Sequence, residues 1–352
     1  MTRQPESPLT GFSLANAIGQ WQKRHGRRDL PWQNTRDPYR VWLSEIMLQQ
    51  TQVATVQGYF TRFLARFPDV GSLAEASLDQ VLGLWAGLGY YSRASNLHRC
   101  AQQVMQLHAG IFPRSAEQLQ TLPGIGRSTA AAIASLCFGE RVAILDGNVK
   151  RVLTRYLGFD ADLAQAANTR SLWDKATDLL PLDDLQSQMP RYTQGIMDLG
   201  ATLCTSKKPM CEVCPLKLQC RAAAIGKPEN FPVKTRKLKR SVQSIWLLWA
   251  QTAEGELWLS QRPTPGVWAG LYCFALFESR ASLQAALPAG QHHRLHDLPA
   301  FKHVLTHKDL YLHLVQVVLP DTCVPDADGA WFERQHWQQM GLPAPIKKLL
   351  IG

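Results

Sequence analysis

The chain has 352 residues, enough for two domains that each bury a core of their own. Hydrophobic residues make up 45% and charged residues 19%, which excludes a disordered chain. Lysine and arginine number 38 against 28 acidic residues, and the net charge of +10 favours a polyanionic partner, nucleic acid first and an anionic membrane surface second. The longest apolar runs are too short to cross a bilayer and the opening residues lack the pattern of a signal peptide, so we expect a cytosolic protein.

The first half, from Leu14 to about Leu203, is predicted to be all-α. Apolar residues recur there at helical spacing, and prolines and glycines are confined to the joints. Glu45 lies in "VWLSEIMLQQ", a helix dominated by apolar and uncharged residues. A buried, unpaired carboxylate would have a raised proton affinity, which suits a general acid. The alternative is the solvated face of an amphipathic helix.

Two further motifs follow in this half. In "LPGIGRSTAAAI", Gly124 and Gly126 predict a turn into a closely packed helix, whose unpaired N–H groups suit a phosphate without reading its base. The segment lacks the third glycine of a dinucleotide fingerprint and a Walker lysine, and a helix joint without a ligand is the alternative. In "ILDGNVKRVL", Asp146 follows an apolar run and precedes a glycine, so its side chain either caps a helix or points into a cleft.

Four of the eight cysteines lie in one segment, "CTSKKPMCEVCPLKLQC", with gaps of six, two and five residues. Since disulfides rarely persist in the cytosol, the cluster indicates metal ligation, with unconnected structural thiols as the alternative. Structural zinc sites usually combine two close pairs of ligands, and here only Cys211 and Cys214 form such a pair. Iron–sulfur clusters accept more varied spacing, so the spacing alone leaves both metals open.

A basic, proline-containing stretch, "KPENFPVKTRKLKR", separates the two halves. We therefore predict a helical domain over residues 1–226, a linker over residues 227–240 and a second domain over residues 241–352. The second domain begins with "SVQSIWLLWA" and "ELWLSQRP", two β-prone runs around "QTAEG" that predict a hairpin. Its fold class is predicted to be α+β.

Several motifs occur together in one order. The segments "LPWQNTRDPYRVWLSEIMLQQTQVATV" and "GLGYYSRASNLH" precede the glycine-rich turn, the Asp146 motif and the cysteines. The set resembles the helix-hairpin-helix DNA glycosylases of the endonuclease III superfamily, and the first two segments resemble its adenine DNA glycosylase branch, MutY. The resemblance covers nearly all of the first half. It implies an all-α glycosylase domain, a helix-hairpin-helix at about residues 120–135 and a 4Fe-4S cluster loop at residues 204–220, with the ligands Cys204, Cys211, Cys214 and Cys220.

The resemblance also implies a mechanism in which two carboxylates break an N-glycosidic bond. Glu45 would protonate the adenine ring at N7, so that the base departs uncharged. Asp146 would face the oxocarbenium-like sugar as an anion, and either water or Asp146 itself would attack the anomeric carbon. Tyr90 and Asn148 enter the site as positioning groups by their place in the motifs. Their alternatives are a core tyrosine and an asparagine at a helix start.

Adenine inside a duplex is unreachable, so such an enzyme must flip it out. The resemblance implies that Gln49, Gln50 and Thr51 form a wedge, that Gly124, Gly126 and Ser128 belong to the DNA-binding hairpin, and that Trp32 borders the adenine pocket. A polar helix end and a core tryptophan are the alternatives. Family members that also cut the strand carry a lysine where this chain has Ser128, so we expect a monofunctional enzyme that leaves an abasic site.

The second domain resembles the Nudix-like domain that ends MutY proteins and senses the oxidised guanine. The resemblance lies in "SQRPTPGVWAGLYCFALFE", whereas "ESRASLQAAL" replaces the clustered glutamates with which Nudix hydrolases bind magnesium. Leu305, Thr306 and His307 occupy the place of the family's Phe-Ser-His loop, so the resemblance makes Thr306 and His307 candidates for contact with 8-oxoguanine. Thr306 keeps a hydroxyl. A strand start with an exposed histidine is the alternative.

The sequence thus predicts a base-excision repair enzyme that removes adenine opposite 8-oxoguanine or guanine. We expect a monomer in the bacterial cytoplasm that acts on the double-stranded DNA of the chromosome. We expect no binding to membranes. Two other classes remain, a catalytically silent DNA-structure binder and a Nudix-type nucleotide hydrolase with a DNA-binding appendage. Retention of both Glu45 and Asp146 disfavours the first, and the missing acidic box disfavours the second.

Overall fold

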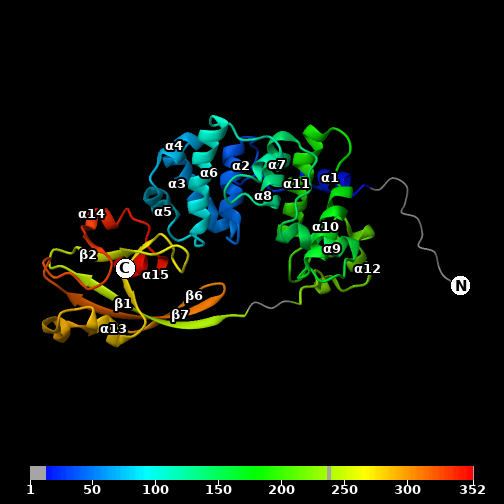
Figure 1. The fold of residues 1–352 in the computed structure, drawn as a ribbon. Helices are drawn as coiled ribbons and strands as arrows, with labels where there is room; N and C mark the ends of the chain where they lie inside the picture. The colour runs from blue at the N-terminus through cyan, green and yellow to red at the C-terminus, as the bar shows by residue number, and fades with distance from the viewer. Residues whose placement is uncertain (1–12, 236–238, 352) are drawn as a thin grey trace. The chain divides into compact units, whose positions relative to one another are not determined.

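The structure, a computed structural model, describes residues 13–235 and 239–351. Residues 236–238 of the predicted linker lie outside the described residues. The chain divides into two compact units, Met1–Thr61 with Cys100–Lys237, and Arg62–Arg99 with Leu238–Gly352. The described part of the first unit is helical, and the second unit combines helices with a β-sheet (Figure 1). Among the described residues, no helix is both long enough and apolar enough to span a membrane.

The first unit is built from α-helices and short 3-10 helices, as predicted for the first half of the chain. They are α1 (Leu14–His25), α2 (Pro38–Leu48), α7 (Ala116–Leu119), α8 (Arg127–Phe138), α9 (Gly147–Leu157), α10 (Ala166–Asp178), α11 (Leu185–Thr202), η1 (Cys211–Val213), η2 (Lys217–Gln219), α12 (Arg221–Ala224) and η3 (Pro228–Asn230). Two more helices, α3 (Val53–Arg66) and α6 (Ser92–His108), run across the division between the units.

Helix α11 is the centre of the first unit, because α1, α8 and α9 all pack against it. Two glycines on α11 permit this close packing. A Cβ atom on Gly195 would lie 2.7 Å from the side chain of Ile18 on α1, and one on Gly200 would lie 2.7 Å from the Cβ of Asn148 on α9. The core around these helices is mostly aliphatic, with Trp173 and Tyr192 also buried in it, and its burial stabilises the arrangement. Gly200 in particular fixes where the first turn of α9 lies.

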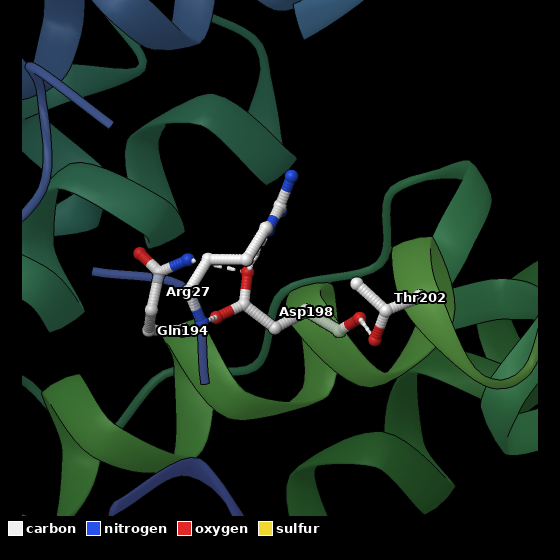
Figure 2. Close-up of polar contacts among 4 residues, drawn as sticks. All are labelled: Arg27, Gln194, Asp198 and Thr202. Carbon is white, nitrogen blue, oxygen red and sulfur yellow. Dashed lines mark hydrogen bonds and ion pairs between the residues drawn. The ribbon is translucent and has the colours of Figure 1, made fainter. Parts of the chain in front are cut away.

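A buried ion pair ties the segment after α1 to α11. Arg27 Nη2 lies 2.7 Å from Asp198 Oδ1, and the side chain of Asp198 is completely buried. The Arg27 backbone N–H donates to Oδ2 of the same carboxylate, and Gln194 Nε2 donates to Oδ1 (Figure 2). Burial raises the pKa of Asp198, although Arg27 opposes this. Without Arg27, the buried negative charge of Asp198 would lack its partner, which would lower the stability of the fold.

The second unit contains helices and one β-sheet. Its helices are α4 (Val70–Glu75), α5 (Leu78–Trp85), α13 (Arg280–Ala285), α14 (Arg334–Trp337), α15 (Ala344–Ile351) and the 3-10 helix η4 (Ala289–Arg294). The strands are β1 (Ser241–Gln251), β2 (Leu257–Gln261), β3 (Tyr272–Cys273), β4 (Ala275–Phe277), β5 (His296–Asp297), β6 (Phe301–Val304), β7 (Lys308–Val318) and β8 (Ala330–Phe332).

The two longest strands, β1 and β7, form the middle of this sheet and run parallel from the pair Ser241 and Lys308 to the pair Gln251 and Val318 (Figure 1). The strand order is β3-β2-β1-β7-β5, with β4 paired to β1, β6 to β7 and β8 to β2. The antiparallel pairing of β1 and β2 confirms the predicted hairpin. Helix α13 packs against β1 and β4, and Leu283 of this helix enters the apolar core of the sheet.

We predict that Arg27→Met strongly destabilises the protein, because it leaves the Asp198 carboxylate buried without its guanidinium. Such a loss typically costs about 3–5 kcal/mol of unfolding free energy. The matched control is Arg280→Met, which breaks a pair with Asp297 that is largely exposed and should cost at most about 1 kcal/mol. Urea unfolding followed by circular dichroism measures both, and equal losses in the two variants would contradict the prediction.

Candidate active site

Glu45 is held in the middle of α2 by a well-formed helix start and a buried face. Asp37 caps the helix by accepting from the Tyr39 N–H, and Pro38 occupies the first turn. On this helix the residues that flank Glu45, Ser44 and Ile46, are both buried. Burial, and then the charge of Asp146, raise the pKa of Glu45 to about 7. The residue as a whole is half-buried.

Asp146 is the N-cap of α9. Its Oδ1 accepts from the Val149 N–H at 2.7 Å, directly after the buried segment of Ala143, Ile144 and Leu145. Burial raises the pKa of Asp146, while the N–H groups of Val149 and Asn148 and then the cations Arg151 and Lys150 act in the opposite direction. The helix-cap alternative from the sequence is therefore correct, but it does not exclude a second role. A carboxylate has two oxygens and several lone pairs, and the cap uses only part of them.

The two carboxyl groups lie near enough to influence each other, because the negative charge of Asp146 raises the pKa of Glu45. Their surroundings differ. The anion of Asp146 is stabilised by backbone N–H groups at a helix start and by two cations, and no such influence acts on Glu45. The causes of the two shifts therefore favour the proton on Glu45 and the negative charge on Asp146. This is the arrangement of an acid beside an anion.

A chain of hydrogen bonds connects the start of α9 to the first cysteine. Arg151 Nη2 donates to Asn148 Oδ1 at 2.7 Å and to the carbonyl oxygen of Gly200 at 2.7 Å, and Nε donates to the carbonyl oxygen of Cys204 at 2.7 Å. Asn148 is thus held on two sides, by this guanidinium and by the close approach of Gly200. Its orientation depends on Arg151.

The four clustered cysteines line a single cavity, together with mostly apolar residues of α9, α11 and the loop itself. In residues 13–235 and 239–351, no group of three His, Cys, Asp or Glu side chains is arranged to hold one metal ion. Four cysteines around one hollow are a donor set that fits an iron–sulfur cluster, which is held by four thiolates.

The predicted hairpin is present between α7 and α8. Gly124 has a φ of 75°, a conformation that glycine adopts at little cost, and Gly126 precedes α8 without any side-chain cap. The first N–H groups of α8 are therefore available at an exposed turn. Ser128 is used inside the unit, because its Oγ accepts from the Leu145 N–H at 3.2 Å.

The predicted wedge residues follow the last turn of α2. Gln49 Nε2 donates to Thr129 Oγ1 of α8 at 3.4 Å, and Thr51 Oγ1 donates to the Gln49 carbonyl oxygen at 3.3 Å. Gln50 is exposed and has a φ of 55°, a left-handed conformation uncommon outside glycine and asparagine. The structure therefore puts Gln50 at the tip of a tight turn that is anchored on both sides.

Trp32 is 8% exposed and packs edge to face on Phe60, with ring centroids 5.4 Å apart. It also lines an open cleft with residues that the sequence had not indicated, among them Arg28, Gln33 and Gln194. Both polar side-chain atoms of Gln33 are buried without a hydrogen-bond partner. Gln194 is oriented by its bond to Asp198 (Figure 2). Their types are common on surfaces, so no sequence pattern could have singled them out.

Tyr90 and Thr306 both belong to the second unit, where their hydroxyl groups are hydrogen-bonded to each other. Tyr90 is 40% exposed and has a φ of 50°. The same pocket is lined by Trp268, His303 and His307. Tyr90 is therefore an exposed group and not the core tyrosine of the alternative interpretation. Thr306 and His307 are also exposed, in the short connection between β6 and β7.

Comparison with known proteins identifies the family. Residues 43–177 match the HhH-GPD superfamily of base excision DNA repair proteins, and residues 246–351 match the NUDIX domain. The chain is 35% identical over 347 residues to the adenine DNA glycosylase of Buchnera aphidicola subsp. Acyrthosiphon pisum, covering 97% of this chain and 98% of the relative. The chain belongs to the adenine DNA glycosylases.

More distant similarities agree with this assignment. The human adenine DNA glycosylase is 33% identical over 391 aligned positions, which cover 92% of this chain and 71% of the human protein. Among solved structures, a thermostable thymine-DNA glycosylase matches with a TM-score of 0.52 at 28% identity, over 60% of this chain and 95% of that one. As an adenine DNA glycosylase, the protein hydrolyses an N-glycosyl bond in base-excision repair. The predicted fold class, a helical glycosylase domain followed by a Nudix-like domain, is confirmed.

We predict that the Glu45 carboxyl of this adenine DNA glycosylase titrates near pH 7 and that Asp146→Asn lowers its pKa. The substitution removes the negative charge that helps to keep Glu45 protonated, while burial continues to raise the pKa above 4.5. Carboxyl-carbon NMR of the labelled protein, with Glu45→Gln to assign the signal, measures the change. An unchanged Glu45 pKa in Asp146→Asn would show that the two groups are not coupled.

Proposed function

We propose that the protein excises adenine paired with 8-oxoguanine or guanine, with Glu45 as the general acid and Asp146 as the anion that faces the sugar. The observation that carries the proposal is the pair of carboxyl groups with different surroundings. Glu45 has a pKa near 7, so a large fraction is protonated at neutral pH, whereas Asp146 sits at a helix start beside two cations. An acid with a pKa near the working pH both holds its proton and releases it readily.

In the proposed reaction, Glu45 gives its proton to N7 of adenine as the bond between the base and the sugar breaks. The base leaves uncharged, and positive charge develops on the sugar. The Asp146 carboxylate stabilises that charge. A water molecule then bonds to the anomeric carbon and gives its proton to the Glu45 carboxylate, or Asp146 bonds first and water displaces it in the same way. Asn148, held by Arg151, keeps the first turn of α9 in place during these steps.

The cleft beside Trp32 is the proposed pocket for the flipped adenine. An amide both donates and accepts, which suits the amino group and the adjacent ring nitrogen of adenine. The amide of Gln33 is buried without a partner in this cleft, so a bound base would satisfy atoms that are otherwise costly to bury. Trp32 supplies an apolar wall for the ring.

We further propose that the enzyme is monofunctional. Strand cleavage by this superfamily requires an amine that forms a Schiff base with the sugar. Ser128 occupies that position here and has no amine. Its hydroxyl accepts a hydrogen bond from the Leu145 N–H. The product is therefore an intact strand with an abasic site.

For DNA contact we propose Gln49, Gln50 and Thr51 as the wedge and the turn around Gly124 and Gly126 as a phosphate site. The exposed, left-handed Gln50 supports the first role, because a tight turn presents its side chain outward. The uncapped start of α8 supports the second.

Recognition of the oxidised guanine is proposed for Thr306 and His307. Both are exposed beside Tyr90 in one pocket, and their hydroxyl and imidazole groups can donate to and accept from a base edge. Tyr90 was expected to position groups at the catalytic site. Its hydrogen bond to Thr306 supports an additional part in lesion contact.

The proposed cofactor is a 4Fe-4S cluster held by Cys204, Cys211, Cys214 and Cys220. When bound, the cluster supplies a rigid, electron-accepting centre that orders its loop. Lys207 and Lys208 are exposed on this loop, and the exposed Arg221 follows it at the start of α12; these cations suit a phosphate backbone.

We predict that Glu45→Gln lowers the single-turnover rate of adenine release from a duplex with one 8-oxoguanine:adenine pair by about 10²–10⁴-fold, the usual contribution of a general acid. Duplex binding should survive, because the amide has nearly the same size. The exposed Glu75 of α4 provides the matched control, and Glu75→Gln should release adenine at the parent rate. A parent protein that retards the duplex without releasing adenine would be a DNA binder and not an enzyme.

We predict that Thr306→Val slows adenine release opposite 8-oxoguanine by about tenfold, the equivalent of one hydrogen bond of about 1.4 kcal/mol. Release opposite guanine should change by much less, since that base lacks the added groups of the lesion. The exposed Thr322 of the same domain serves as control through Thr322→Val. Equal slowing on both substrates would assign Thr306 a structural part only.

A further inference from the structure

Arg155 of α9 is buried, with 2% of its surface exposed, and every bond that its guanidinium makes runs to the loop that carries the cysteines or to its flanks. Its acceptors are the carbonyl oxygens of Thr205 (2.7 Å), Ser206 (3.3 Å), Pro228 (2.8 Å) and Phe231 (3.3 Å), and the sulfur of Cys204 (3.3 Å). One side chain thus joins the chain just after the first cysteine to the chain beyond the last.

The charge of this guanidinium has no carboxylate partner among the described residues. The contrast with Arg27 is informative, because that arginine pairs directly with Asp198. A buried cation without a counter-ion is costly even when its N–H groups are satisfied by carbonyl oxygens. The N–H groups of Arg155 therefore have hydrogen-bond acceptors, but its positive charge has no ion-pair partner among the described residues.

The cavity beside Arg155 is the place where an anionic group could bind. Its lining contains the four cysteines, Arg155 and Lys217, and no carboxylate, although the charge of Glu229 acts on Cys211 from outside the lining. Four thiolates outweigh the positive charge of an iron–sulfur core, so a cluster bound there is an anion. The unpaired guanidinium and the anionic group would each neutralise the other in a region of low dielectric constant.

We propose that Arg155 is the counter-ion of the cluster and the clamp of its loop. The proposal rests on the cluster that the proposed function includes. Through the N–H donated to the Cys204 sulfur, and through its charge, Arg155 favours the reduced, more negative form of the cluster and so raises its reduction potential. Through the four carbonyl bonds it holds both ends of the loop, which slows the loss of iron.

These two effects are separable by substitution. Arg155→Lys keeps the positive charge but cannot reach five acceptors, whereas Arg155→Gln loses both the charge and most of the donors. The matched control is Arg141, a half-buried arginine that also binds only carbonyl oxygens, those of Pro181 (2.9 Å) and Thr177 (3.3 Å). Arg141 does not line the cysteine cavity, so Arg141→Gln tests the cost of losing an arginine clamp as such.

The experiment uses the full-length protein purified without oxygen. Iron and sulfide content, the rate of bleaching by an iron chelator and the reduction potential on a DNA-modified electrode, which supplies the electron, are measured for the parent and the three variants. We expect both Arg155 variants to bleach at least several-fold faster than the parent and than Arg141→Gln. The reduction potential should fall in Arg155→Gln and stay close to the parent value in Arg155→Lys.

The proposal would be overturned if both Arg155 variants bleached at the rate of the parent protein and had its reduction potential. If Arg155→Gln does not fold, Arg155→Lys decides alone, since bleaching at the parent rate there contradicts the clamp. A parent protein without iron and sulfide would also overturn it. Adenine release by that same sample is measured separately, so the failure of this inference is distinguishable from failure of the proposed glycosylase mechanism.

Discussion

The structure of the candidate active site depends on one constraint, the burial of two carboxyl groups close enough to repel each other. Two anions in such a place would be unstable, so the surroundings must assign the proton to one of them. Helix α9 makes this assignment, because its first N–H groups and the cations Lys150 and Arg151 stabilise the anion of Asp146 alone. Glu45 lies on an otherwise buried face of α2, and burial raises its pKa to about 7.

The same helix connects the carboxylates with the cysteine loop. Asp146 caps the start of α9, and Asn148, Arg151 and Arg155 follow at spacings of three and four residues, which keep these three on one face. The charge of Asp146 acts on Glu45, Asn148 accepts a hydrogen bond from Arg151, and the two arginines bind the loop around Cys204. Helix α11 supports this arrangement from the other side, since only a glycine at position 200 permits such a close approach. The loop is therefore connected to the first turn of α9 through Arg151 and Asn148.

Particular residues show how far the sequence could predict the site. The motif around Asp146 offered a helix cap and a cleft carboxylate as alternatives, and the structure makes it a cap that also influences Glu45. Asn148 was predicted to be a positioning group, but its partner Arg151 was not indicated, because the bond depends on the carbonyl groups of another helix. The unpartnered amide of Gln33 was missed for a similar reason. Burial of a single glutamine has no signature in a sequence.

The sequence by itself determined the helical and α+β halves, the hairpin of β1 and β2, and the family, because periodicity and local motifs are properties of neighbouring residues. It also indicated that the four cysteines act together. Only the tertiary structure decided which carboxyl group is the weaker acid, that the buried Arg155 forms no ion pair within the described residues, and which amide lies unpaired in a cleft. These properties arise from desolvation and from charges on segments far apart in the chain, and both exist only once the helices have packed.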